Sequence, residues 1–248
     1  MSLLSGLKPT TAVKEESDNL GGGFGPMPSG AHDMTIDLAY LGKSEGGALS
    51  LTIHATGPNR ETFRNTLWVT SGNAKGNKTT YTNKRTKEEV FLPGFSIANH
   101  ICMLTAGKEI FDLEEETKTI KLYNFKQGKE APTDVQTIPA IMGERVTLGL
   151  IKQIVDKNVK NGKGKYVPSG ETREENEIDK VFQIDSGKTV TELRAKGDAE
   201  FIKAWREKWD GTTRDRSTKN VGASNGTPGA PGALGQAAIS TEPNMFSQ

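Results

Sequence analysis

Apolar and polar residues alternate over several short stretches in the first third of the chain. The first series covers residues 34–38 and the second covers residues 49–53, with a Gly-rich turn between them. A third series, residues 62–70, places Leu67 on one side and Trp68 on the other, since successive side chains of a strand point to opposite faces. This pattern predicts three antiparallel strands.

The spacing of apolar residues becomes helical after the third strand. Ile97, Ile101 and Leu104 recur three or four positions apart, as apolar residues do on one face of a helix. Ser96 is the predicted N-cap of this helix and Gly107 its predicted end. The sequence therefore predicts one short helix directly after three strands.

Alternation returns after this helix, and residues 118–125, 134–141 and 144–155 are further predicted strands. Three strands, a helix and then more strands is the order of a small barrel of the OB type. The predicted fold class is therefore mainly β: an OB-fold-like Greek-key barrel with a short helix between strands 3 and 4, a C-terminal helix and disordered termini.

Composition divides the chain into four parts. Residues 1–30 are rich in Gly, Pro and Ser. We expect a flexible N-terminal arm, of which one short piece could be anchored on the folded core. Residues 31–156 form the predicted OB-fold core, and residues 157–211 a polar insert followed by the C-terminal helix. Residues 212–248 are dominated by small and polar residues that could bury little surface, so we expect a disordered tail.

The C-terminal helix is predicted from its start and stop signals and from one apolar stripe. Asp198 is the predicted cap and Gly211 the predicted stop. The stripe consists of Phe201, Ile202, Trp205 and Trp209. A stripe at helical spacing favours packing of this helix on a core.

The composition bounds the possible functions. The chain has 248 residues and a net charge of +1, and its mean hydropathy is −0.56. One cysteine excludes an internal disulfide framework. No stretch approaches the roughly 18 apolar residues of a membrane span, and the first residues lack a signal-peptide pattern, so we expect a cytoplasmic protein with no membrane contact. With so little net charge, an electrostatic site has to be local.

The segment TSGNAKGNKTTYTNKRT, residues 70–86, is such a local site. It holds four basic residues, one tyrosine and no acid. Basic side chains displace counterions from nucleic-acid phosphates, and aromatic rings stack on bases. The candidate DNA-binding residues are Arg60, Arg64, Trp68, Lys75, Lys78, Tyr81, Lys84, Arg85, Lys87, Lys121, Tyr123 and Phe125. The alternative is a solvated hairpin loop, with Trp68 buried by another element.

The loop would extend the usual binding site of an OB-fold. That site lies across strands 2 and 3, between the loops that join strands 1–2 and strands 4–5. Residues 42–47 and residues 126–134 are those two loops by our count. The basic segment instead follows strand 3, and so brings its charge next to Trp68.

Patterns of enzyme sites fail in this sequence. GNAKGNKT is not a phosphate loop, because Asn77 separates Gly76 from Lys78. His100 and Cys102 lie two positions apart on the predicted helix, where side chains do not face each other. Three histidines and one cysteine fall into no zinc pattern. We therefore predict no catalytic residue, no metal and no cofactor.

Two other functions stay open. The acidic runs DLEEE and REENE are typical of solvated surface, but a nuclease that uses scattered carboxylates with metal ions would look similar. A non-enzymatic scaffolding protein with a β core and flexible arms is the other alternative. The residues alone do not decide between a nucleic-acid-binding surface and a solvated loop at residues 70–86.

Several blocks of the sequence carry a family resemblance. They are SGAHDMTIDLAYLGKSEGGALSLTI, LWVTSGNAKGNKTTY, FLPGFSIANHICML, IMGERVTLGLIKQIVDKN, GETREENEIDKVF, GKTVTEL and FIKAWREKW. Over about residues 25–211 the chain resembles the single-stranded-DNA-binding proteins encoded by bacteriophages.

The resemblance implies an OB-fold that binds single-stranded DNA with little sequence preference, in phage DNA replication and recombination. It implies partners among phage replication or transcription proteins, in the cytoplasm of an infected bacterium. It also implies Trp68 and Tyr81 as stacking residues, and as phosphate contacts Lys75, Lys78, Lys84 and Arg85. The final STEPNMFSQ departs from the acidic tail of many such proteins, since Glu242 is its only acid.

Overall fold

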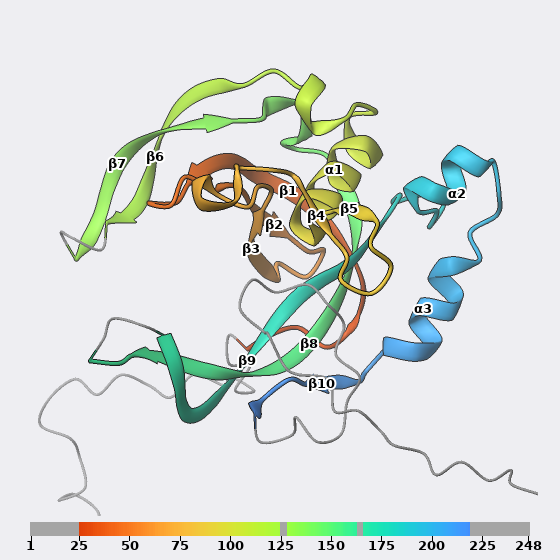
Figure 1. Cartoon of the computed structure of the whole chain (residues 1–248). Coiled ribbons are helices and arrows are strands. Elements are labelled where there is room, and N and C mark those ends of the chain that lie inside the picture. The colour runs from red at the N-terminus through yellow and green to blue at the C-terminus, as the bar shows by residue number, and fades with distance from the viewer. Residues whose placement is uncertain (1–24, 125–127, 163–165, 219–248) are drawn as a thin grey trace, which may run out of the picture.

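An open β-sheet dominates the computed structural model, which describes residues 25–124, 128–162 and 166–218 (Figure 1). The eight strands of this sheet are β1 (Gly30–Lys43), β2 (Leu49–Thr56), β3 (Thr62–Trp68), β6 (Glu116–Asn124), β7 (Lys129–Thr137), β8 (Arg145–Lys160), β9 (Tyr166–Phe182) and β10 (Thr213–Asp215). A separate hairpin consists of β4 (Thr80–Thr82) and β5 (Glu89–Phe91). All ladders are antiparallel except the one between β10 and β8. The prediction of a mainly-β fold is confirmed.

Strand β1 organises the sheet because it has partners on both edges. It pairs with β2 on one edge, whereas β8 and β7 pair with its first and last parts on the other. A bulge between Ile36 and Leu38 shifts the register. Leu38 is therefore only half-buried and Ala39 is fully buried. The alternation predicted through residue 38 is wrong beyond Ile36, because a bulge inserts an extra residue.

The sheet does not close on itself. Its strand order is β10-β8-β1-β2-β3, and no ladder among the described residues joins β3 to β8 or β9. Helix α1 (Pro93–Thr105) packs against β3 on one side and against β9 on the other (Figure 1). The helix after the third strand of the sheet is confirmed, although the β4–β5 hairpin precedes it. The OB-type barrel stays a prediction.

Helix α1 starts earlier than the sequence suggests. Pro93 occupies its first turn and Leu92 its N-cap position, because a proline there loses no hydrogen bond and has the φ of a helix. Ser96 lies inside the first turn, where its N–H donates to the Leu92 carbonyl at 2.9 Å. The predicted N-cap at Ser96 is therefore wrong. The predicted end is right, since the helix stops before Gly107, whose φ is 69°.

The hydrophobic core lies between the curved sheet and α1. Its members come from β1, β2, β3, β8, β9 and the buried face of α1, and include Met34, Ile36, Leu51, Ile53, Leu67, Phe95, Ile101, Leu148 and Val181. A second small cluster contains Ile151, Phe182 and Trp205. The longest described helix, α1, has 13 residues, and no helix of the described residues is long and apolar enough to cross a membrane.

Two C-terminal helices follow β9, and the second of them docks on the sheet through Trp205. Helix α2 (Val190–Ala195) begins with a capping box between Thr189 and Glu192. The Glu192 carboxylate also accepts from the N–H groups of residues 200 and 201. The N-cap residue of α3 (Phe201–Trp209) is Glu200, so the predicted cap at Asp198 is wrong. Trp205 is buried, and its indole N–H donates to Asp179 at 2.7 Å.

The polar segment 157–188 belongs largely to the β8–β9 hairpin. Strand β8 continues through the predicted core boundary at residue 156, and β9 pairs with it along most of its length. The outer half of this hairpin is exposed on both faces, so it lacks the alternation that predicts a strand. The loop predicted at 126–134 is wrong from Lys129 on, where β7 begins, and residues 126–127 lie outside the described residues.

The ordered structure extends beyond both predicted boundaries of the arm and the tail. The Asn176 side chain bonds to the backbone N–H and carbonyl of Met27, and Ser29 accepts from the backbone of Lys152. Strand β10 starts inside the predicted tail and runs parallel to β8. The arm and tail are therefore ordered at residues 25–30 and 212–218. Residues 1–24 and 219–248 lie outside the described residues.

Candidate nucleic-acid interface

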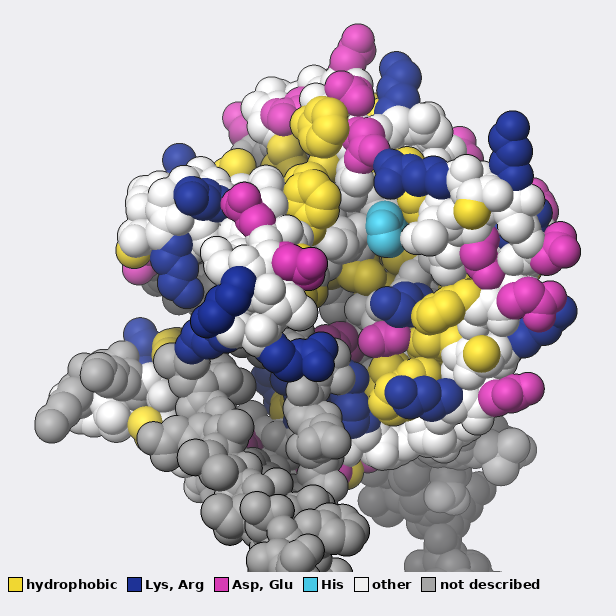
Figure 2. Space-filling model, turned by 45° about the vertical axis from the view of Figure 1, so that its right-hand side comes forward, with side chains coloured by type: hydrophobic (Ala, Val, Ile, Leu, Met, Phe, Trp, Pro, Cys, Tyr) yellow, Lys and Arg dark blue, Asp and Glu magenta, His cyan; other side chains and the backbone are white. Residues whose placement is uncertain are grey.

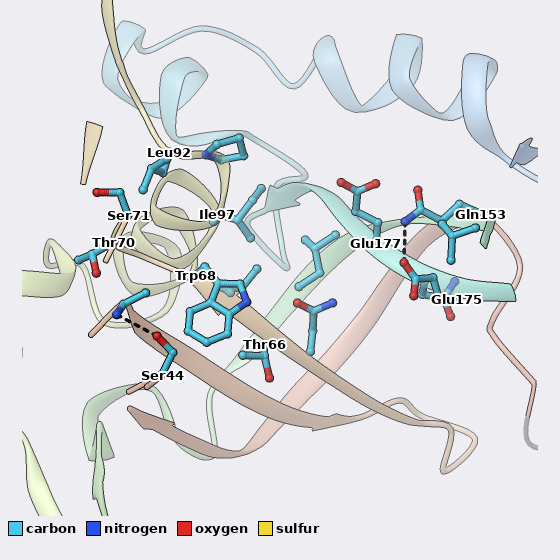
Figure 3. Close-up of a pocket in the computed structure, with 18 of the residues that line it drawn as sticks. Ser44, Thr66, Trp68, Thr70, Ser71, Leu92, Ile97, Gln153, Glu175 and Glu177 are labelled. Carbon is cyan, nitrogen blue, oxygen red and sulfur yellow. Dashed lines mark hydrogen bonds between the residues drawn. The ribbon is translucent and has the colours of Figure 1, made fainter. Parts of the chain in front are cut away.

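An open cleft of about 780 Å³ lies between the free edge of β3 and the middle of the β8–β9 hairpin (Figure 3). The start of α1 forms its third side. The residues that line these three sides include Thr66, Leu67, Trp68, Leu92, Pro93, Gly94, Ile97, Gln153, Val155, Glu175, Glu177 and Ile178. The cleft therefore occupies the gap that the open sheet leaves between its two ends.

Trp68 stands in this cleft with 42% of its surface exposed. Its neighbours Leu67 and Val69 point into the core, so alternation turns the indole outward. The backbone of Gly94 lies directly against the backbone of Trp68: a Cβ added to Gly94 would lie 2.3 Å from the Trp68 carbonyl oxygen. The result is an exposed ring on a rigid backbone, which suits stacking on a base. The alternative that another element buries Trp68 is wrong.

The first half of the basic segment forms a compact loop at the rim of the cleft. Ser71 and Lys78 bond to each other twice, at 2.9 and 3.0 Å. The N–H of Asn73 donates to the Gly46 carbonyl at 2.8 Å, which docks the loop on the β1–β2 turn. This framework holds Lys75 in the lining of the cleft, with Lys78 exposed nearby.

The second half of the basic segment is the β4–β5 hairpin. Tyr81 is half-buried and pairs with Val90. Lys84, Arg85 and Lys87 are all exposed at the turn of this hairpin, where Asn83 accepts from the Arg85 N–H at 2.9 Å. None of these residues lines the cleft. They add positive charge beside the loop that carries Lys75, without being part of the cleft surface.

The other candidate residues are spread over three places. Arg64 shares the outer face of β3 with Trp68 and donates to the Tyr40 hydroxyl at 3.1 Å. Arg60 lies at the opposite end of β3, in the turn after β2. Lys121 and Tyr123 are exposed on the β6–β7 hairpin, which projects to the left in Figure 1, away from α1. Phe125 lies outside the described residues.

The β9 wall of the cleft was not predicted. Glu175 accepts from Gln153 at 3.0 Å and from Arg173 at 2.9 Å. Glu177 accepts from Arg214 and Arg216. These acids belong to the REENE run that the sequence alone assigns to solvated surface. Their pairing with cations offsets much of the negative charge that they would present to DNA.

Two features of the described residues bear on enzyme chemistry: the grouping of metal-ligating side chains and the state of Cys102. No group of three or more His, Cys, Asp or Glu side chains among them could hold a metal ion. Cys102 is fully buried in the core, and burial raises the pKa of its thiol to about 12. A protonated and inaccessible thiol is a poor nucleophile.

Comparison with known proteins assigns no family to this chain. No protein-family model matches it, and no curated protein matches its sequence. The function has to follow from the chemistry of the cleft.

Proposed function

We propose that the protein binds single-stranded DNA with little sequence preference, and that it protects the strand and keeps it unpaired during phage DNA replication and recombination. The observation that carries this proposal is the exposed ring of Trp68 in an open cleft whose lining also includes Lys75. A strand would place a base on this ring and its phosphates along the basic loop and hairpin.

This arrangement favours the single strand over the duplex. Bases in a duplex are stacked on one another and cannot lie on the Trp68 ring, whereas every unpaired base offers a flat face. Each stacked base contributes about 1–3 kcal/mol. Binding only the unpaired form shifts the duplex equilibrium by mass action.

The order of the elements supports an OB-type plan for this function. A β1–β2–β3 meander is followed by the short β4–β5 hairpin, by α1 and then by the β6–β7 hairpin. Strand β1 pairs along both of its edges, as in a small Greek-key barrel. In this plan the cleft at the open edge is the binding groove.

Neutralising the basic loop tests the electrostatic part of the proposal. About four phosphate contacts give a plot of log affinity against log salt with a slope near −3. We expect Lys75→Gln combined with Lys78→Gln to bring this slope closer to zero by about 1.4. Lys118→Gln, on β6, is the control and should leave the slope unchanged. An unchanged slope in the Lys75/Lys78 variant would contradict the proposal.

A second candidate function is that of a scaffolding protein. Aromatic side chains are exposed near the ends of the two long hairpins, with Tyr123 at 54% and Tyr166 at 68%. Exposed aromatic side chains favour contacts with another protein. This function predicts no salt-dependent affinity for DNA, so the same titration separates the two candidates.

A further inference from the structure

A second cation lines the cleft, on the wall opposite to the one that carries Lys75. It is Arg216, which directly follows β10. Strand β10 runs beside the middle of β8, and the N–H of Arg216 donates to the Ile154 carbonyl at 2.8 Å. Val155, the next residue of β8, lines the same wall. The backbone of Arg216 is thus fixed on the sheet, across the cleft from Trp68.

Two arginines share one carboxylate at this wall. Glu177 accepts from Arg214 and, at 3.5 Å, from one Nη of Arg216. The side chain of Arg214 is 16% exposed and also donates to Gln153, whereas the side chain of Arg216 is 28% exposed. Arg214 therefore balances most of the charge of Glu177. Among the described residues, Glu177 is the one partner of the Arg216 side chain, and this long contact leaves most of the guanidinium N–H donors unused.

The charges inside the cleft are arranged differently from those on the outer surface. On the face shown in Figure 2, Lys and Arg side chains are interspersed with Asp and Glu, so the surface charge there marks no path for a phosphate chain. The charged residues of the cleft lining are two cations, Lys75 and Arg216, and two acids, Glu175 and Glu177. Both acids already accept hydrogen bonds from arginines, Glu175 from Arg173 at 2.9 Å. A bound anion would therefore meet one available cation on each wall.

We infer that Arg216 binds a phosphate of the DNA strand whose base stacks on Trp68, so that the strand is held between the two walls of the cleft. This inference rests on the proposed function and adds a contact from the far wall (Figure 3). A guanidinium can donate paired N–H bonds to a phosphate, and Glu177 keeps its bond from Arg214 when Arg216 turns to the strand. The segment after α3, which has the composition of a tail, then completes the groove.

The test replaces Arg216 and measures the affinity for oligo-dT at several salt concentrations. Arg216→Gln should bind about tenfold more weakly at about 50 mM salt, the effect of losing one hydrogen bond to a charged group. Its salt slope should be shallower by about 0.7, the share of one phosphate contact on a single strand. Between about 50 and about 200 mM salt, the wild type then loses about 2.6-fold more affinity than this variant. Arg206→Gln is the matched control, because it removes the same charge from an exposed position of α3 outside the cleft lining.

A second measurement uses the wild-type protein and does not depend on how Arg216→Gln folds. Phenylglyoxal modifies accessible arginines, and mass spectrometry locates the modified residues. Oligo-dT should protect Arg216 from this reagent and leave Arg206 reactive.

Two outcomes would overturn this inference alone, in a protein that binds oligo-dT. One is equal modification of Arg216 with and without oligo-dT, and the other is an Arg216→Gln protein with the affinity and salt slope of Arg206→Gln. Failure of the wild type to bind oligo-dT would instead overturn the proposed function.

Discussion

Gly94 is the residue whose substitution tests the construction of the cleft. In an exposed helix, Gly→Ala stabilises by about 1 kcal/mol. Here the new Cβ would lie 2.3 Å from the Trp68 oxygen, 2.9 Å from its nitrogen and 3.0 Å from its carbonyl carbon. Trp68 cannot yield easily, because it pairs with Ser50 at the end of the β2–β3 ladder. Helix and strand have to separate.

We therefore expect Gly94→Ala to lower the free energy of unfolding by about 1–3 kcal/mol, the usual cost of overpacking a close contact. Urea denaturation followed by circular dichroism measures this difference. Gly162→Ala is the control, since nothing lies within 4 Å of its added Cβ, and it should be neutral or slightly stabilising. A Gly94→Ala protein as stable as the wild type, or more stable, would refute the close approach of α1 to Trp68.

Three further predictions concern the core and the titratable groups. Trp205→Ala should lower the free energy of unfolding, measured by urea denaturation, by about 3–5 kcal/mol, because it leaves a cavity in the cluster of Ile151, Phe182 and Trp205 and removes the hydrogen-bond donor to Asp179. Trp205→Phe should lower it less, and equal losses in the two variants would contradict this prediction. Burial is the largest cause that lowers the pKa values of His54 and His100. As the pH falls, the unfolded state therefore binds protons before the folded state does, so the free energy of unfolding should fall below about pH 6.5. His100→Gln should make this fall smaller, and an unchanged pH dependence of stability would contradict the prediction. Cys102, with a thiol pKa of about 12, should react with an alkylating reagent only on unfolding, as mass spectrometry can show; rapid labelling of the native protein would be inconsistent with its burial.

Local alternation made part of the site predictable. Leu67 and Val69 are apolar and flank Trp68, so a strand through all three residues has to turn the indole outward. The concentration of lysines after that strand places charge at the same end. Both features depend only on neighbours in sequence, and the structure shows both.

The opposite wall of the cleft depends on contacts between distant parts of the chain. Glu175, Asn176 and Glu177 of β9 line the cleft and are all polar, so no alternation of apolar and polar residues marks them as part of a strand. Arg216 comes from a segment with the composition of a disordered tail, and is fixed because its N–H donates to the Ile154 carbonyl at 2.8 Å. The fit of Gly94 on Trp68 arises only when helix and strand pack. Single-sequence patterns do not contain such information.

Tryptophan fluorescence during titration with oligo-dT, against a duplex of the same length, tests the central claim most directly. The chain has three tryptophans, of which Trp205 is buried and Trp209 is packed beside Lys208 and Arg214. We expect strong quenching by the single strand that weakens with salt, that is lost in Trp68→Phe and that persists in Trp209→Phe. Equal quenching by the duplex, or full quenching in Trp68→Phe, would contradict the claim that the cleft at Trp68 binds single-stranded DNA.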